Sequence, residues 1–274
     1  MDRPIPRWLR AFFLVVTVQA FLVTPALFQP SLINIVEPWP ASPLNARFIG
    51  ALYTALGIGV LLCLGARAFR EVRLILIGIG VATGVLLVIS LARLQAFGLG
   101  ELALHQFPTM WILFYIIDPL VVVYTLWRFR DSDPAGGGRS DLWPLWTAEA
   151  ALLGLVALVL LVAPPLAMRL WPWALTEPLS QLYSGHFLTL AFVCALAARE
   201  ARWEGVRIVA VTLVVLSLLV LAVSVIHLDR FKPNASTIVW FALFGAEAVG
   251  LGLLLWRRGL RRAPSAPEPR ATLP

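Results

Sequence analysis

Residues 73–97 read RLILIGIGVATGVLLVISLARLQAF, and residues 207–231 read RIVAVTLVVLSLLVLAVSVIHLDRF. Both segments begin with an arginine, continue through an apolar run and end with a phenylalanine at the same spacing. A correspondence at a fixed offset is the sequence signature of a repeated architecture. These two segments therefore predict that the chain is built from two related halves.

The correspondence extends in both directions. The spacing from Trp111 to Asp118 equals the spacing from Trp240 to Glu247, and a Trp-Arg pair follows each at residues 127–128 and 256–257. Upstream, a Pro-Leu pair and a glycine at residues 43, 44 and 50 match those at residues 178, 179 and 185. We predict a first repeat over residues 1–130 and a second over residues 142–260. A flexible Gly-rich linker at residues 131–141 joins them, and a disordered tail follows at residues 261–274.

The composition places the chain outside the soluble class. Hydrophobic residues make up 60% of it, charged residues 14%, and the mean hydropathy is +0.85. The sequence predicts an all-α integral membrane protein with about eight transmembrane helices, because each such helix needs roughly 20 mostly apolar residues. The predicted spans are centred on residues 11–29, 46–66, 74–92, 108–127, 144–168, 184–198, 208–227 and 237–256.

The basic residues predict how the spans are oriented. If the connecting segments alternate sides, 17 of the 22 Lys and Arg residues fall on one side. The remaining five are Arg47, Arg93, Arg169, Arg230 and Lys232. Cytoplasmic segments of membrane proteins carry such an excess, so both termini are predicted to be cytoplasmic, in the cell inner membrane. Four helices return each half to its starting side, so the repeats are predicted to be parallel.

The formal net charge of +7 does not indicate a nucleic-acid partner. The arginines lie in short segments between apolar runs, where they hold topology and contact anionic lipid headgroups. The first apolar run follows two arginines, as in a signal peptide. Its loose match to the internal fifth span, through Pro25 and Pro164, predicts instead a retained helix. The predicted partners are the bilayer and other membrane subunits.

Asp118 and Glu247 are the leading candidates for a functional site. Each lies about ten residues into its predicted span, roughly 15 Å from its outer edge at 1.5 Å per residue. Ionisable residues at that depth usually face a bundle interior or a water-filled path. Such a carboxyl group can bind and release a proton or pair with a cationic substrate. The alternative is a protonated acid that hydrogen-bonds a neighbouring helix for packing.

Several other features carry structural predictions. Pro119 follows Asp118 directly and predicts a local break in the helical hydrogen bonding. Glu149, with no counterpart in the first half, is predicted to neutralise a basic residue such as Arg128 or Arg257. The pattern Gly80-(x)3-Gly84 predicts close helix packing within the bundle. Trp171 and Trp173 predict that the connection at residues 169–183 lies along the outer membrane interface.

His105, His186 and His227 are all predicted on the outer side, where Asp229 also lies. Histidines with carboxylates could form a metal site, and two histidines could hold a haem. Only His227-x-Asp229 has a spacing that would suit ligands, and that pattern is common by chance. We therefore predict no metal and no cofactor, and assign these residues to a polar cluster at the outer loops.

Three functions remain open from the sequence. The first is a small-molecule or ion transporter that uses Asp118 and Glu247, which fits parallel repeats with midplane acids. The second is a non-catalytic membrane subunit or assembly factor, which fits the scarcity of polar residues in several spans. The third is a membrane enzyme acting on a lipid or quinone at the outer interface. The chain has no P-loop, HExxH or GxSxG motif, so enzyme activity is not expected.

Overall fold

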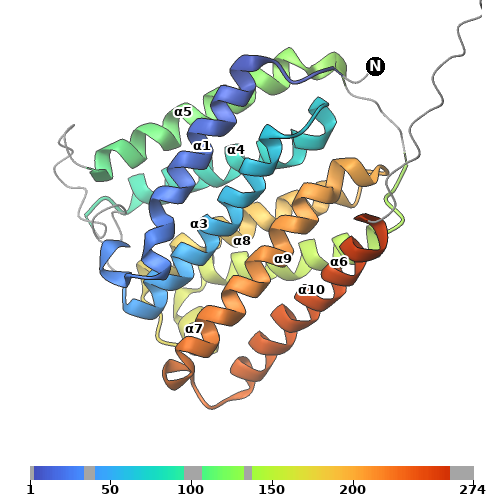
Figure 1. The fold of residues 1–274 in the computed structure, drawn as a ribbon. Helices are drawn as coiled ribbons and strands as arrows, with labels where there is room; N and C mark the ends of the chain where they lie inside the picture. The colour runs from blue at the N-terminus through green and yellow to red at the C-terminus, as the bar shows by residue number, and fades with distance from the viewer. Residues whose placement is uncertain (1–2, 34–40, 96–106, 133–137, 260–274) are drawn as a thin grey trace, which may run out of the picture.

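The computed structural model describes residues 3–33, 41–95, 107–132 and 138–259. Within this part of the chain, eight helices are long and apolar enough to cross a membrane, so the protein is a multi-pass helical membrane protein (Figure 1). These helices are α1 (Arg7–Val23), α3 (Pro43–Leu64), α4 (Phe69–Ala92), α5 (Phe107–Arg128), α6 (Trp143–Val162), α8 (Glu177–Ala197), α9 (Trp203–Ile226) and α10 (Ala235–Gly259).

Short helical segments occupy the ends of the bundle. They are η1 (Thr24–Leu27), η2 (Pro30–Leu32), η3 (Arg130–Ser132), α7 (Pro164–Leu170) and η4 (Leu228–Arg230). The single span predicted over residues 144–168 is therefore wrong in one respect, because α6 ends at Val162 and α7 is separate. Proline lacks the backbone N–H that would continue the helical hydrogen bonds, so the chain turns at Ala163, just before Pro164.

Local sequence signals explain where the helices begin. Pro43 starts α3, and the Ser42 hydroxyl accepts a hydrogen bond from the backbone N–H of Asn45 at 3.4 Å. At the start of α4, Glu71 Oε1 accepts from the backbone N–H of Ala68 at 3.0 Å. These side chains satisfy N–H groups that have no partner within the first helical turn.

The helices divide into an inner and an outer group. In α8, 72% of the residues in its 18-residue apolar stretch are buried, whereas in α10 the share is 11%. Helix α3 packs against α1 and α9, and α8 packs against α6 and α4. Helix α4 packs against α5 and α9, and α10 packs against α9. Figure 1 shows α1, α3, α4 and α5 toward one side of the bundle and α6, α8, α9 and α10 toward the other.

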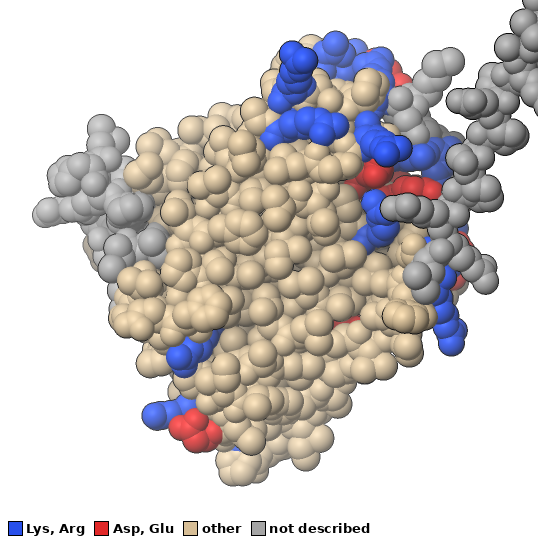
Figure 2. Space-filling model, in the orientation of Figure 1, with Lys and Arg blue, Asp and Glu red and all other residues tan. Residues whose placement is uncertain are grey.

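One end of the bundle, at which α1 starts, is rich in arginine (Figure 2). We call it the arginine-rich end. There the Arg10 guanidinium donates to the carbonyl oxygens of Leu64 and Ala66 at 2.6 and 3.0 Å, which ties α1 to the end of α3. Arg258 of α10 donates to Asp141, just before α6, at 2.8 Å. This hydrogen bond lowers the pKa of the Asp141 carboxyl. On the face shown in Figure 2, a broad belt with few charged residues separates this end from the opposite one.

The opposite end contains a buried aromatic cluster around Asn45. The side-chain oxygen Oδ1 of Asn45 accepts hydrogen bonds from Trp173 Nε1 at 2.8 Å and from the Tyr183 hydroxyl at 2.9 Å. Trp171 and Trp173 are 6% and 2% exposed, so their indoles are buried within the protein. Asn45, distant in sequence, supplies a buried acceptor for the indole N–H of Trp173. The position of the connection at residues 169–183 along the outer interface stays a prediction.

Candidate functional site

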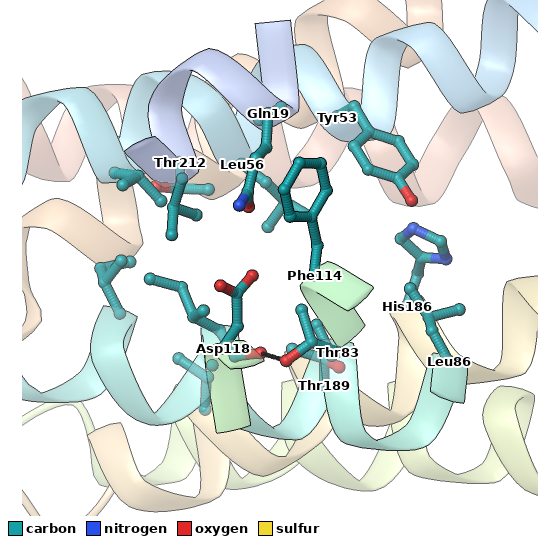
Figure 3. Close-up of a pocket in the computed structure, with 18 of the residues that line it drawn as sticks. Gln19, Tyr53, Leu56, Thr83, Leu86, Phe114, Asp118, His186, Thr189 and Thr212 are labelled. Carbon is teal, nitrogen blue, oxygen red and sulfur yellow. Dashed lines mark hydrogen bonds between the residues drawn. The ribbon is translucent and has the colours of Figure 1, made fainter. Parts of the chain in front are cut away.

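Asp118 faces a cavity in the centre of the bundle. The cavity has a volume of about 110 Å³ and is lined by residues of α1, α3, α4, α5, α8 and α9. The Asp118 side chain is buried, with 2% of its surface exposed. Figure 3 shows its carboxylate pointing into the cavity, toward the side-chain amide of Gln19 on α1. We call this space the central cavity.

The backbone around Asp118 brings α4 and α5 close together. A Cβ atom added at Gly80 would lie 2.8 Å from Cγ1 of Val122, one helical turn beyond Asp118. A Cβ atom at Gly84 would lie 4.0 Å from the ring of Pro119. The predicted packing role of Gly80-(x)3-Gly84 within the bundle is therefore confirmed. Gly80 in particular lets α5 approach α4 on the face that carries Asp118 to the cavity.

Three threonines line the central cavity from three different helices. The hydroxyls of Thr83, Thr189 and Thr212 donate to the carbonyl oxygens four residues earlier, at 2.7, 2.8 and 2.9 Å. A hydroxyl whose hydrogen is used in this way retains lone pairs and can still accept a hydrogen bond. The threonines therefore offer acceptors, not donors, to a molecule in the cavity.

The other wall of the cavity is aromatic. The hydroxyl oxygens of Tyr53 and Tyr115 lie 2.9 Å apart, and the ring of Trp111 lies edge-on to Tyr53 with 5.9 Å between centroids. His186 also packs edge-on against Tyr53, at 5.6 Å between ring centroids. Its Nδ1 lies 3.3 Å from the carbonyl oxygen of Leu182, which can only accept, so Nδ1 carries the hydrogen. In the neutral ring Nε2 is then an acceptor.

Glu247 does not share the central cavity with Asp118. It accepts a hydrogen bond at Oε2 from the Ser217 hydroxyl at 2.8 Å, and its Oε1 is buried without a hydrogen-bond partner. Glu247 lies in a separate groove of about 630 Å³ between α6 and α10, where its carboxyl interacts with that of Glu149. Glu149 thus faces another acid from within α6, and not Arg128 or Arg257 as predicted. Helix α10 packs on α9 with this face turned toward α6, which brings the two acids together.

The structure describes three residues of the predicted outer polar cluster and gives His186 and His227 different surroundings. His186 is 2% exposed and lies inside the bundle, at the central cavity. His227 lies at the end of α9, close to Asp229 and beside Arg47. His105 falls outside the described residues. In the part of the chain that the structure describes, no three His, Cys, Asp or Glu side chains are grouped to hold a metal ion.

Sequence reasoning missed most of the residues that surround Asp118. These are Gln19, Tyr53, Thr83, Thr189 and Thr212. Each is a polar side chain within a predicted span, and intramembrane polar residues tend to face the protein interior. That signal was present for every one of them. Which of them meet in one place depends on how six helices are rotated about their axes, and apolar runs without clear periodicity do not specify such rotations.

The pairing of His227 with Arg47 carries a prediction about pH. His227 Nε2 lies 2.6 Å from Arg47 Nη1, so this ring nitrogen accepts the hydrogen bond. Partial burial, Arg47 and Arg230 lower the pKa of His227 below its usual 6.5, while Asp229 acts against them. The folded protein therefore takes up this proton less readily than the unfolded chain. The resulting stability is present above about pH 6.5 and is lost as the pH falls below it.

We expect the melting temperature of the wild type to fall more than that of His227→Gln between about pH 7.5 and about pH 5.5. Glutamine can still accept from Arg47 but does not titrate, so it is a matched replacement. The measurement is thermal unfolding of the purified protein in detergent. Parallel pH profiles for the two proteins would contradict the assignment.

Comparison of the chain with protein-family models, with curated proteins and with solved structures finds no match. The proposals below therefore depend on the geometry of this chain alone.

Proposed function

We propose that this protein is a membrane transporter for a small molecule or ion, with Asp118 at its substrate or proton site. The observation that carries the proposal is the central cavity itself. A buried carboxylate points into a space enclosed by six helices, about halfway along α5. An ionisable group at that depth is costly in a bilayer, and in proteins it commonly marks a substrate or ion pathway.

The packing of the helices supports a two-fold arrangement of two repeats. The first set of helices is α1, α3, α4 and α5, and the second set is α6, α8, α9 and α10. The packed pairs α1–α3 and α4–α5 of the first set correspond to the pairs α6–α8 and α9–α10 of the second. Between the sets, contact α3–α9 corresponds to contact α8–α4, and α4 packs against its own counterpart α9. This pattern is what an axis along the membrane normal would produce. In transporters built from such repeats, substrate sites lie near the midplane at the repeat interface.

The central cavity occupies that interface. Four of its lining helices, α1, α3, α4 and α5, belong to the first set, and α8 and α9 belong to the second. Rocking of one set against the other would open the cavity first to one side and then to the other. We propose that the arginine-rich end and both termini face the cytoplasm, because cytoplasmic segments of membrane proteins carry an excess of basic residues.

The proposal is tested by uptake into proteoliposomes containing the purified protein. The panel of solutes covers alkali cations, small amines, weak acids, amino acids and neutral polyols. We expect protein-dependent uptake of at least one class of solute. Asp118→Asn should reduce this uptake by at least about tenfold, because loss of the charged contact between the buried carboxylate and the bound substrate costs more than about 1.4 kcal/mol.

The matched control is Glu149→Gln, which removes another carboxylate of the membrane interior outside the central cavity. It should leave uptake intact, and both variants should elute as folded protein in size-exclusion chromatography. Equal uptake by wild type and Asp118→Asn, or no protein-dependent uptake across the panel, would overturn the transporter assignment.

The groove between α6 and α10 favours a second candidate function, that of a membrane subunit in a larger complex. Helix α10 packs mainly against α9, and Cβ atoms added at Gly245, Gly250 or Gly252 would meet nothing within 4 Å. Small residues let another helix backbone approach closely. We propose that a membrane helix of a partner subunit packs there if the chain serves as a subunit of a larger complex. Gentle purification from native membranes tests this role. A subunit of a larger complex should co-purify with a stoichiometric partner, and purification of the chain alone would contradict the role.

A further inference from the structure

We propose that the central cavity binds a small organic cation with a primary ammonium group, about the size of methylammonium or ethylammonium. This inference rests on the proposed function for the site, and it names the chemical class of the ligand. Charge, hydrogen-bonding capacity and size each support the same class.

The described lining of the cavity contains an acid and no Lys or Arg. Among the described residues that line it, Asp118 is the only Asp, Glu, Lys or Arg. A buried carboxylate without a basic partner is stabilised by a cation that enters beside it. An anionic ligand would face repulsion from Asp118 and would find no Lys or Arg in the lining to bind it.

The hydrogen-bonding groups of the cavity mainly accept. The Asp118 carboxylate accepts, and the hydroxyls of Thr83, Thr189 and Thr212 have already donated to their own helices. The Gln19 side chain offers both a carbonyl oxygen and an amide N–H₂. A primary ammonium group has three N–H donors and no acceptor, so it complements such a lining. A carboxylic acid or a phosphate would require donors in their place.

The size and the apolar wall limit the rest of the ligand. An apolar cavity of about 150 Å³ holds benzene, so a cavity of about 110 Å³ admits only a few heavy atoms. Tyr53, Trp111 and Phe114 supply aromatic surface on one side. Aromatic rings attract a cation electrostatically and also pack against a short alkyl group.

The second set of helices does not repeat this site. The space beside Glu247 between α3, α6, α8, α9 and α10 has a volume of about 10 Å³, and Phe48, Phe187 and Phe244 line it. Phe244 stands where the repeat alignment has Tyr115 in the first half. Apolar side chains thus fill the position that corresponds to the central cavity. The proposed cation site therefore has no equivalent beside Glu247 between the corresponding helices.

The test is calorimetric titration of the full-length protein in lipid nanodiscs with ethylammonium chloride. At about pH 7 an alkylamine is protonated. We expect binding of one ethylammonium per chain, and roughly 10- to 100-fold weaker binding to Asp118→Asn, as expected for loss of a charged hydrogen bond. Glu149→Gln, outside the cavity, should bind like the wild type.

The ligand class can be decided on the wild type alone, whatever the folding of the variants. Ethanol matches ethylammonium in size but has no charge, acetate has the opposite charge, and sodium has the charge without the alkyl group. Tighter binding of any of these three than of ethylammonium would overturn the proposal, as would the absence of ethylammonium binding. Binding of ethylammonium without its uptake would contradict only the assignment as a transporter. Uptake of solutes other than organic cations would contradict only the proposed class of ligand.

Discussion

Asn45→Ala is expected to lower the free energy of unfolding by about 2–6 kcal/mol, because each of two buried donors left unpaired costs about 1–3 kcal/mol. Asn45 is 3% exposed, and its Oδ1 accepts from both Trp173 Nε1 and the Tyr183 hydroxyl. Both aromatic residues are at most 2% exposed, so water cannot replace the lost acceptor without opening the cluster. The measurement is the fraction of protein that remains folded in detergent along a temperature series.

The expected mechanism is checked by a double-mutant cycle with Tyr183→Phe. Phenylalanine removes one of the two donors, so Asn45→Ala should cost at least about 1 kcal/mol less in that background than in the wild type. A cost that is the same in both backgrounds would show that the hydrogen bond to Tyr183 does not stabilise the fold. The variant Thr147→Ala, at an exposed position on α6, is the control and should have little effect.

Gly59→Ala is expected to destabilise the protein by about 1–3 kcal/mol through overpacking between α3 and α9. A Cβ atom at Gly59 would overlap the hydroxyl oxygen of Thr212, which belongs to the other set of helices. The control is Gly154→Ala on α6, where the new Cβ would lie 3.7 Å from the Cβ of Ala191, an ordinary contact. Both changes improve helix propensity by up to about 1 kcal/mol. The difference between their effects on stability therefore measures the cost of the overlap with Thr212.

Thr212→Ala should restore stability to Gly59→Ala, because it removes the oxygen that the new methyl group would meet. By itself the threonine change should cost little, since its hydroxyl donates only within α9, to Ile208 at 2.9 Å. Thermal unfolding of the four proteins in the same detergent provides the comparison. If the double variant is as unstable as Gly59→Ala, the overlap with Thr212 is not the cause.

The membrane-spanning helices were predictable from sequence because length and apolar composition alone define them. The prediction located all eight, and it missed the break after Val162 only because the apolar run passes through Pro164 without a polar residue. It also located Asp118 as a buried acid. It could not separate Asp118 from Glu247, since both have the same depth and spacing in the sequence.

What separates these two acids is the surroundings that other helices provide. Asp118 faces Gln19 across an open space, whereas Glu247 meets Ser217 and Glu149. These contacts join residues 30 to 99 positions apart in the chain, as the pairs Ser217–Glu247 and Gln19–Asp118 show. Helix rotation decides them, and continuous apolar runs contain little information about rotation.

The Arg10 guanidinium has a mechanical consequence. Its two hydrogen bonds to Leu64 and Ala66 fasten the start of α1 to the end of α3, and the backbone N–H of Phe69 donates to the carbonyl oxygen of Arg3 at 3.0 Å. Three helices are thereby braced at one corner. A tilt of α1 would therefore strain its hydrogen bonds to the end of α3 and the start of α4. Because α4 also packs against α5, a shift of this corner would reach the helix that carries Asp118.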